Sequence, residues 1–244
     1  MKIGLVIADD MEFEPVAEKS KLYNGESYNI CGDRAVSFET VCGNKIVAVL
    51  CGTGKVNAAG ATAALICKEK PDCIINIGLS GAIKGVYKND IVIGTKFLEH
   101  DFDLTPLGYE VGVKPQHKYI YEPDSELFKR FCEKFSKIKP CVFVTGDMFV
   151  SSKEKKDFII EKFDGGCCDM ESAAVASVCY KMEVPFLSLR KLSDDADESA
   201  ADIYRESNNL KEDVLINMII SLFGWQKRAK MWKKLLIFNS FKRI

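Results

Sequence analysis

Residues 73–81 read Cys-Ile-Ile-Asn-Ile-Gly-Leu-Ser-Gly, a short, mostly apolar run that stops at a glycine-rich end. Such a run, bounded by turn residues, is typical of a strand that is buried on both faces of a sheet. Three other segments repeat the pattern, namely Lys2–Ala8, Cys141–Thr145 and Pro185–Leu192, and they are followed by Asp9-Asp10, Gly146-Asp147 and Ser193-Asp194. The chain therefore places polar or flexible residues directly after several buried strands.

Helices are predicted between these strands. They cover Met11–Lys19, Ala58–Lys70, Ser125–Phe135, Ser151–Phe163, Ser172–Met182 and one long segment, Ala200–Phe223. The turn signal Gly43-Asn44 predicts a hairpin, and Asp90–Leu98 is a further strand. We expect an α/β fold: a single-domain three-layer α/β/α architecture with a mixed, mostly parallel central sheet. Ligands of such sheets bind beyond the carboxyl ends of the strands, so the polar strand ends should line one crevice.

Composition narrows the class of protein. The chain has 244 residues, of which 47% are hydrophobic and 28% charged, so it is globular rather than disordered. The net charge of -1 gives no global field that would favour nucleic acid. Residues 224–244 carry seven basic and no acidic residues, which sets a basic amphipathic extension apart from a domain at 1–223. Contact of this extension with an anionic membrane is one interpretation, and an extra packed helix is the favoured one.

Ten cysteines are present, and none forms a C-x-x-C pair. Most of them sit in apolar runs, so we expect buried, reduced thiols. The chain begins directly with a strand-like run, and no window approaches about 18 uncharged apolar residues. A cytoplasmic protein is expected.

Two motifs suggest a phosphate-binding loop and a metal site, but neither has all the residues that such a site needs. Gly52-Thr-Gly-Lys55 lacks the glycine of a Walker A loop at Val49 and the hydroxyl residue at Val56, so a tight strand-to-helix turn is favoured. His100-Asp-Phe-Asp103 has no third metal-ligating partner nearby, so no metal site is expected.

A set of motifs in one order carries a family resemblance. The motifs are Met11-Glu-Phe-Glu14, Gly52-Thr-Gly-Lys-Val-Asn-Ala-Ala, Ile75-Asn-Ile-Gly-Leu-Ser-Gly81, Asn89-Asp-Ile-Val, Thr145-Gly-Asp-Met-Phe149, Asp169-Met-Glu-Ser-Ala-Ala and Arg190-Lys-Leu-Ser-Asp194. Together they resemble the nucleoside phosphorylase superfamily, and most closely its 5′-methylthioadenosine/S-adenosylhomocysteine nucleosidase branch, over about residues 1–223. The resemblance implies hydrolysis of the N-glycosidic bond of a 5′-modified adenine nucleoside, with no cofactor.

The resemblance also implies roles for the catalytic residues. Asp194, which Ser193 would orient, matches the acid that protonates purine N7 as the base leaves. Glu14 matches the carboxylate that polarises the attacking water, with Glu12 as the nearby competitor. Arg190 matches the arginine that supports the water and the carboxylates.

The residues that would bind the substrate follow from the same resemblance. Met170 and Glu171 would hold the ribose, and Phe149 and backbone groups of Val150 would hold the adenine. The remaining candidates are Ser80 and Gly81 at the glycine-rich strand end, Tyr204 at the 5′ substituent, and Leu107 and Pro115 from the partner subunit of a homodimer. On the residues alone, Met170 and Phe149 could equally be core side chains, and Glu171 a carboxylate that favours a helix start.

Two positions depart from the nucleosidase pattern and keep other functions open. Leu79 stands where a serine is usual, and Thr53 stands where a larger aliphatic residue is common. Phosphorolysis is one rival, but acidic residues around Asp9–Glu14 would repel phosphate, so hydrolysis is favoured. A nucleoside-binding protein without catalysis is a second rival, and a nucleosidase for another purine nucleoside, such as a futalosine-like compound, is a third.

Overall fold

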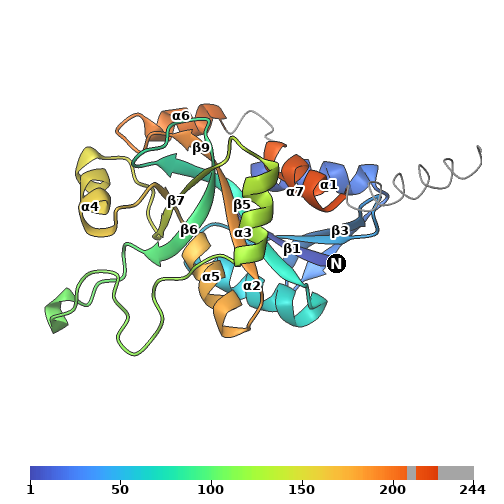
Figure 1. The fold of residues 1–244 in the computed structure, drawn as a ribbon, viewed down its shortest axis with the longest axis horizontal. Coiled ribbons are helices and arrows are strands. Elements are labelled where there is room, and N and C mark those ends of the chain that lie inside the picture. The colour runs from blue at the N-terminus through green and yellow to red at the C-terminus, as the bar shows by residue number, and fades with distance from the viewer. Residues whose placement is uncertain (208–212, 225–244) are drawn as a thin grey trace, which may run out of the picture.

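The computed structural model describes residues 1–207 and 213–224, and its strands form one sheet (Figure 1). The strands are β1 Lys2–Ile7, β2 Glu26–Ile30, β3 Asp33–Glu39, β4 Lys45–Leu50, β5 Cys73–Ala82, β6 Ile91–Glu99, β7 Lys139–Thr145, β8 Cys167–Asp169 and β9 Phe186–Asp194. Their order is β2-β3-β4-β1-β5-β8-β7-β6-β9, and β5 also pairs with β9. The strands from β5 to β9 therefore close on themselves, which the sequence did not predict.

Parallel and antiparallel pairs share this sheet. The pairs β1–β4, β1–β5, β5–β9, β6–β7 and β7–β8 are parallel, and the predicted hairpin β3–β4 is antiparallel. Strands β2 and β8 were not predicted; β8 is only three residues long, and β2 is exposed along most of its length. The mixed α/β fold class is confirmed.

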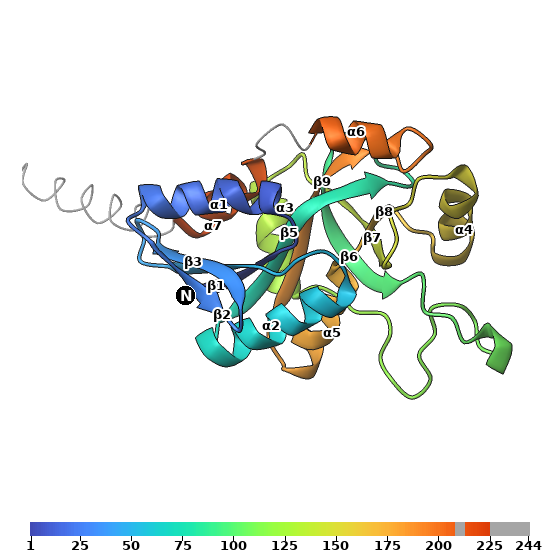
Figure 2. The same cartoon turned by 180° about the vertical axis from the view of Figure 1, so that it is seen from behind.

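Helices cover both faces of the sheet (Figures 1 and 2). One face carries α1 Asp10–Leu22, α3 Ser125–Lys134 and α7 Val214–Gly224, and the other carries α2 Lys55–Glu69 and α5 Ser172–Lys181. Strand β1 shows why two cores form. Ile3, Leu5 and Ile7 join the core under α1 and α7, whereas Val6 joins the core under α2 and α5, because successive strand side chains point to opposite faces.

The predicted long helix from Ala200 to Phe223 is wrong. Helix α6 Ala200–Ser207 and helix α7 are separate, and Asp213, just before α7, is not helical. Helix α6 packs against β9, whereas α7 buries its apolar side chains in the core between α1 and α3. Figure 1 shows the two helices as separate segments over different parts of the molecule. The basic extension predicted at residues 224–244 lies outside the described residues beyond Gly224.

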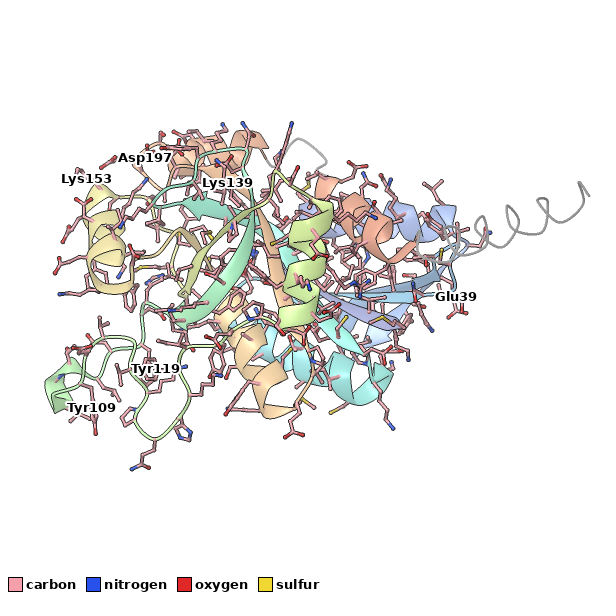
Figure 3. All side chains as sticks on the ribbon, in the orientation of Figure 1. Glu39, Tyr109, Tyr119, Lys139, Lys153 and Asp197 are labelled. Carbon is pink, nitrogen blue, oxygen red and sulfur yellow. The ribbon has the colours of Figure 1, made fainter. Side chains whose placement is uncertain are left out.

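Helix α4 and the 3-10 turn η1 complete the described elements. Helix α4 Lys153–Phe163 follows β7, and the 3-10 turn η1 Thr105–Leu107 lies in the long segment between β6 and α3. Figure 3 shows this segment projecting from the body with Tyr109 and Tyr119 on it. Within the described ranges, no helix has the length and apolar character needed to cross a membrane.

Candidate active site

A cavity of about 300 Å³ opens at the carboxyl ends of β1, β5 and β9, where the crevice was expected. Its size is at the lower end of small-molecule sites. Its walls are Ala8, Asp9, Glu12, Thr53, Leu79, Ser80, Gly81, Met148, Phe149, Val150, Cys168, Asp169, Met170, Glu171, Arg190, Ser193, Asp194 and Tyr204. Of the predicted site residues, the structure brings together all except Glu14, Leu107 and Pro115.

Arg190 occupies the floor of the cavity and is only 1% exposed. Its Nη2 donates to Asn76 Oδ1 at 2.7 Å and to Glu171 Oε2 at 3.3 Å, and it lies 3.4 Å from Asp169 Oδ2. Its Nη1 donates to Leu79 O at 3.2 Å. A buried guanidinium needs such partners, because an unpaired charge away from water is strongly unfavourable.

Gly78 makes room for this arrangement. It pairs with Arg190 across β5 and β9, and a Cβ at residue 78 would come within 2.5 Å of Arg190 Nη1 and 2.8 Å of Glu12 Oε2. The glycine that ends the apolar run in the sequence is therefore required by the approach of two charged groups.

Glu171 points into the cavity. It stands at the N-cap position of α5, but its side chain caps nothing there; Oε1 accepts from Gly54 N–H at 3.1 Å and Oε2 from Arg190. The helix is capped by Asp169, whose Oδ1 accepts from the N–H groups of Glu171 and Ser172, each at 3.1 Å. Burial raises the pKa of Glu171, and the Arg190 charge opposes that rise. Glu171 therefore does not serve as the carboxylate that favours the start of α5; its side chain lines the cavity instead.

Asp194 also lines the cavity; it ends β9 and is 2% exposed. Its Oδ2 accepts from Ser193 Oγ at 2.6 Å and its Oδ1 from Ala196 N–H at 2.9 Å. Burial raises the pKa of Asp194 in spite of these two hydrogen bonds. A general acid must be protonated before it acts, and a raised pKa keeps a carboxyl group protonated up to a higher pH.

The structure corrects the placement predicted for Glu14. Its Oε1 accepts from Arg34 Nη2 at 2.7 Å outside the cavity, whereas Glu12 lines the cavity. Residues two apart on a helix point about 200° away from each other, so only one of the two can face the site. On the helical wheel of α1, Glu14 lies in line with the exposed Asp10 and Glu18, whereas Glu12 lies in line with the buried Val16.

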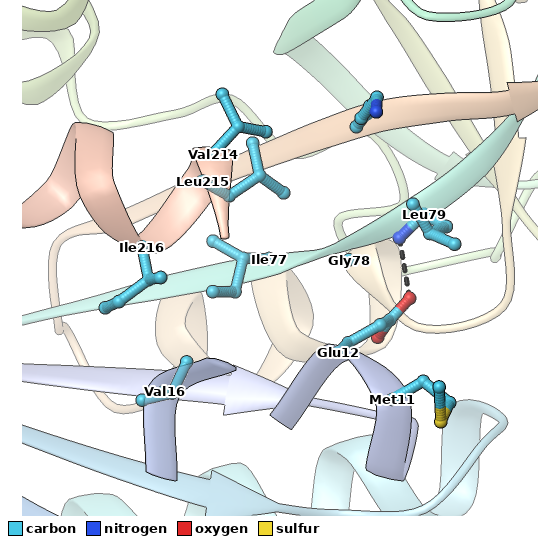
Figure 4. Close-up of a pocket in the computed structure, with 10 residues that line it drawn as sticks. Met11, Glu12, Val16, Ile77, Gly78, Leu79, Val214, Leu215 and Ile216 are labelled. Atoms are coloured by element: carbon cyan, nitrogen blue, oxygen red, sulfur yellow. Dashed lines mark hydrogen bonds between the residues drawn. The ribbon is translucent and has the colours of Figure 1, made fainter. Parts of the chain in front are cut away.

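Glu12 has the environment of a base that works near neutral pH. Its Oε1 accepts from Leu79 N–H at 2.6 Å, as the dashed line in Figure 4 shows. Its Oε2 is buried and has no hydrogen-bond partner among the described residues. Burial raises the pKa of Glu12 to about 7, against the lowering effect of Arg190 and the Leu79 N–H.

An apolar pocket of about 30 Å³ explains this burial (Figure 4). It lies against Glu12 on the side of α7 and is walled by Val16, Ile77, Leu215 and Ile216. The carboxylate therefore has an apolar wall on one side and the larger cavity on the other, so its ionised form is stabilised mainly by Arg190 and one N–H group.

The backbone of residue 79 serves the site whatever its side chain. Its N–H binds Glu12 and its carbonyl binds Arg190, while the leucine side chain lines the cavity. Ser80 Oγ is buried without a hydrogen-bond partner in the described part of the chain, and Ser80 O accepts from Ser193 Oγ at 3.3 Å.

Aromatic side chains form the mouth of the cavity. Phe149 is 45% exposed, and its ring meets Tyr204 edge to face with centroids 5.6 Å apart. Val150 is buried beneath them, and Met170 lines the same cavity. The exposure of Phe149 excludes the core interpretation for that residue, because a core side chain is covered.

Leu107 and Pro115 lie on the projecting segment and do not line the cavity. Leu107 is 71% exposed at the end of η1. No group of three or more His, Cys, Asp or Glu side chains arranged to hold an ion occurs among the described residues.

Comparisons with known proteins agree on one family. Residues 2–221 match the model of the phosphorylase superfamily. A 5′-methylthioadenosine/S-adenosylhomocysteine nucleosidase of an Exiguobacterium species is 40% identical over 209 residues, which cover 82% of this chain and 88% of that protein.

Solved structures give the same result. A Helicobacter pylori nucleosidase with 5′-methylthioadenosine in its active site superposes with a TM-score of 0.83 at 26% identity, covering 91% of this chain and 97% of that one. A futalosine hydrolase of the same organism gives a TM-score of 0.84 at 27% identity, with coverage of 91% and 97%.

Replacement of Glu12 should make the protein more stable at high pH. The raised pKa means that Glu12 contributes stability below its unfolded value of 4.5, and this contribution is lost as the pH rises through about 7. Wild type should lose about 3 kcal/mol of unfolding free energy through Glu12 between about pH 4 and pH 8. Glu12→Gln should not show this loss, so its stability relative to wild type should rise by the same amount over that pH range. Urea unfolding at the two pH values measures this difference. Glu14→Gln on the same helix is the matched control, and a gain in that variant instead would refute the assignment.

Proposed function

Because the chain belongs to the phosphorylase superfamily, we propose that it hydrolyses the N-glycosidic bond of a 5′-modified adenine nucleoside, of the methylthioadenosine or S-adenosylhomocysteine type, and releases adenine. The observation that carries the proposal is that one cavity is lined by two buried carboxyl groups, Asp194 and Glu12, together with the hydrogen-bonded pair of Glu171 and Arg190. Burial raises the pKa of both Asp194 and Glu12.

Asp194 is the proposed leaving-group acid. A purine leaves as an unfavourable anion unless N7 receives a proton, so a carboxylic acid must lie beside the ring. Asp194 shares the cavity with Phe149 and Val150, which are suited to stack on adenine and to bind its edge. Ser193 Oγ holds the carboxyl group in one orientation.

Glu12, rather than Glu14, is the proposed base toward water. Its unpartnered Oε2 lies beside the cavity, and its pKa of about 7 leaves it able to accept a proton near neutral pH. Arg190 lowers that pKa and so keeps a fraction of Glu12 ionised.

Glu171 is the proposed ribose ligand, with Met170 packed on the sugar. A carboxylate that accepts hydrogen bonds from ribose hydroxyls also stabilises the positive charge that develops on the sugar in the transition state. Its position is held from both sides, by Gly54 N–H and by Arg190.

Hydrolysis is favoured over phosphorolysis by the charges of the cavity walls. Arg190 is the one cationic side chain among the lining residues described, and its Nη groups already donate to Asn76, Glu171 and Leu79. Carboxylates of Asp9, Glu12 and Glu171 would repel a phosphate dianion.

The ten cysteines support a reducing, cytoplasmic location. All are free thiols, and even Cys141 and Cys167, whose sulfur atoms lie 3.9 Å apart, are not bonded to each other. Burial raises the pKa of Cys168, which lines the cavity, to about 12, so its thiol stays protonated.

The wild-type chain should release adenine from methylthioadenosine and S-adenosylhomocysteine without phosphate. Incubation with these nucleosides, adenosine, inosine and futalosine, with and without phosphate, followed by chromatography of the free base, measures this. Strict dependence on phosphate would make the protein a phosphorylase, and tight binding without any product would make it a binding protein.

Asp194→Asn should lower kcat by about 100-fold or more with little change in KM, because the lost proton acts only in the transition state. Asn keeps the shape of the side chain and can still accept from the Ala196 N–H. Turnover near that of wild type would show that another group protonates the base.

A homodimer is the proposed assembly, with Leu107 and Pro115 reaching the partner's cavity. Light scattering should give twice the mass of one chain, and Leu107→Asp should lower both the dimer fraction and the activity. A monomer with full activity would contradict this arrangement.

A further inference from the structure

Two motifs that the proposed function leaves unused meet in the structure. Lys55, from the strand-to-helix turn after β4, lies against Glu99 at the end of β6 and Asp101 just beyond it. Together the two motifs form one ion cluster next to the cavity.

The geometry of the cluster is tight. Lys55 Nζ donates to Asp101 Oδ1 at 2.6 Å and to Glu99 Oε2 at 3.0 Å. The three side chains are 19%, 22% and 11% exposed, so the charges are largely shielded from water. Lys114 Nζ, from the projecting segment, also donates to Glu99.

Burial opposes ionisation in the cluster, but hydrogen bonds and charge outweigh it. Burial by itself raises the pKa of Asp101, yet the hydrogen bonds from Lys55 Nζ and Asp147 N–H bring that pKa below its ordinary value. Burial lowers the pKa of Lys55, whereas its bonds to Asp101 and Glu99 raise that pKa above the ordinary value. Both groups therefore stay charged, and their attraction is stronger than that of an exposed pair.

One arm of the cluster reaches the adenine side of the cavity. Asp101 Oδ2 accepts from Asp147 N–H at 2.8 Å, and Asp147 Oδ1 accepts from Lys55 N–H at 2.8 Å. Asp147 begins the loop that carries Met148, Phe149 and Val150 into the cavity wall. Asp101 and Lys55 thus hold the first residue of that loop from its backbone and its side chain.

The other arm reaches the ribose side. Gly54 N–H, next to Lys55 in the chain, donates to Glu171 Oε1. Gly54 has a φ of +97°, and a Cβ there would come within 3.0 Å of Asp147 Oδ1. The glycine lets two consecutive N–H groups bind two different carboxylates: that of Gly54 binds Glu171 and that of Lys55 binds Asp147.

We propose that Lys55 is a positioning residue of this enzyme, which sets the separation between the adenine loop 147–150 and the ribose carboxylate Glu171 by clamping Asp101 and Glu99. The inference rests on the proposed function for the identity of the ligand. Lys55 itself does not line the cavity, so it acts through Asp147 and Gly54.

Lys55→Met tests the proposal. KM for methylthioadenosine and the inhibition constant for free adenine should both rise about tenfold or more, since small displacements of positioning groups weaken productive binding. The acid limb of the kcat/KM profile, which reports Glu12, should stay at the same pH. Lys55→Arg keeps the charge and should restore most of the affinity.

Lys2→Met is the matched control. Lys2 pairs with Glu69 at 3.3 Å and is 32% exposed, at the amino end of β1 and away from the cavity. Its loss should lower the melting temperature and leave both constants unchanged. Unchanged KM and adenine constants in a folded Lys55→Met protein, or an equal rise in Lys2→Met, would overturn the proposal.

If Lys55→Met does not fold, Asp101→Asn tests the same proposal. The amide still accepts from Asp147 N–H but loses the charge that binds Lys55, so the same constants should rise, though by less. Their constancy in folded Asp101→Asn would also overturn the proposal. If wild type hydrolyses no adenine nucleoside, the proposed function fails, while adenine binding by calorimetry still decides the role of Lys55. A wild-type chain that neither hydrolyses an adenine nucleoside nor binds adenine overturns both.

Discussion

The buried guanidinium of Arg190 is the constraint on which the site depends. A cation that is 1% exposed must have partners nearby, and here β5 supplies Asn76 and the Leu79 carbonyl while the β8–α5 turn supplies Asp169 and Glu171. The arginine thus joins strands that are far apart in the chain. Its approach also requires the glycine at position 78.

Burial shifts the pKa values of the carboxyl groups near the cavity to different extents, because these groups have different hydrogen-bonding and charged partners. Burial raises the pKa of Glu12 to about 7, with Arg190 limiting the rise. Asp194 has hydroxyl and N–H partners, and its pKa is raised. Asp101 has Lys55 beside it, and its pKa is lowered. One fold therefore gives three carboxyl groups different pKa shifts, and these differences follow from the charge and hydrogen-bond donors next to each group.

Pairing of β5 with β9 brings the two walls of the site together. Gly81 lies opposite Asp194 in this pair, and the register shifts between Ser80 and Gly81. A bulge re-aims the side chains that follow it. The irregularity lies where β5 meets Asp194, so the closure of the sheet also sets the position of this carboxyl group.

The sequence by itself determined the fold class and the strand ends that line the cavity, because buried strands and helices have distinct apolar periods and polar residues after parallel strands share one edge. Asp194 could be placed in this way, whereas Glu171 and most of the other candidate residues were placed only by the family resemblance. The tertiary structure alone decided three things. It separated Glu12 from Glu14, which local sequence order had ranked in the opposite way, since the choice depends on which face of α1 meets β5. It divided the predicted helix at 200–223, because α6 and α7 pack on different parts of the molecule. It joined Lys55 to Asp101, since an ion pair between residues 46 positions apart exists only once the fold brings the turn after β4 against the end of β6.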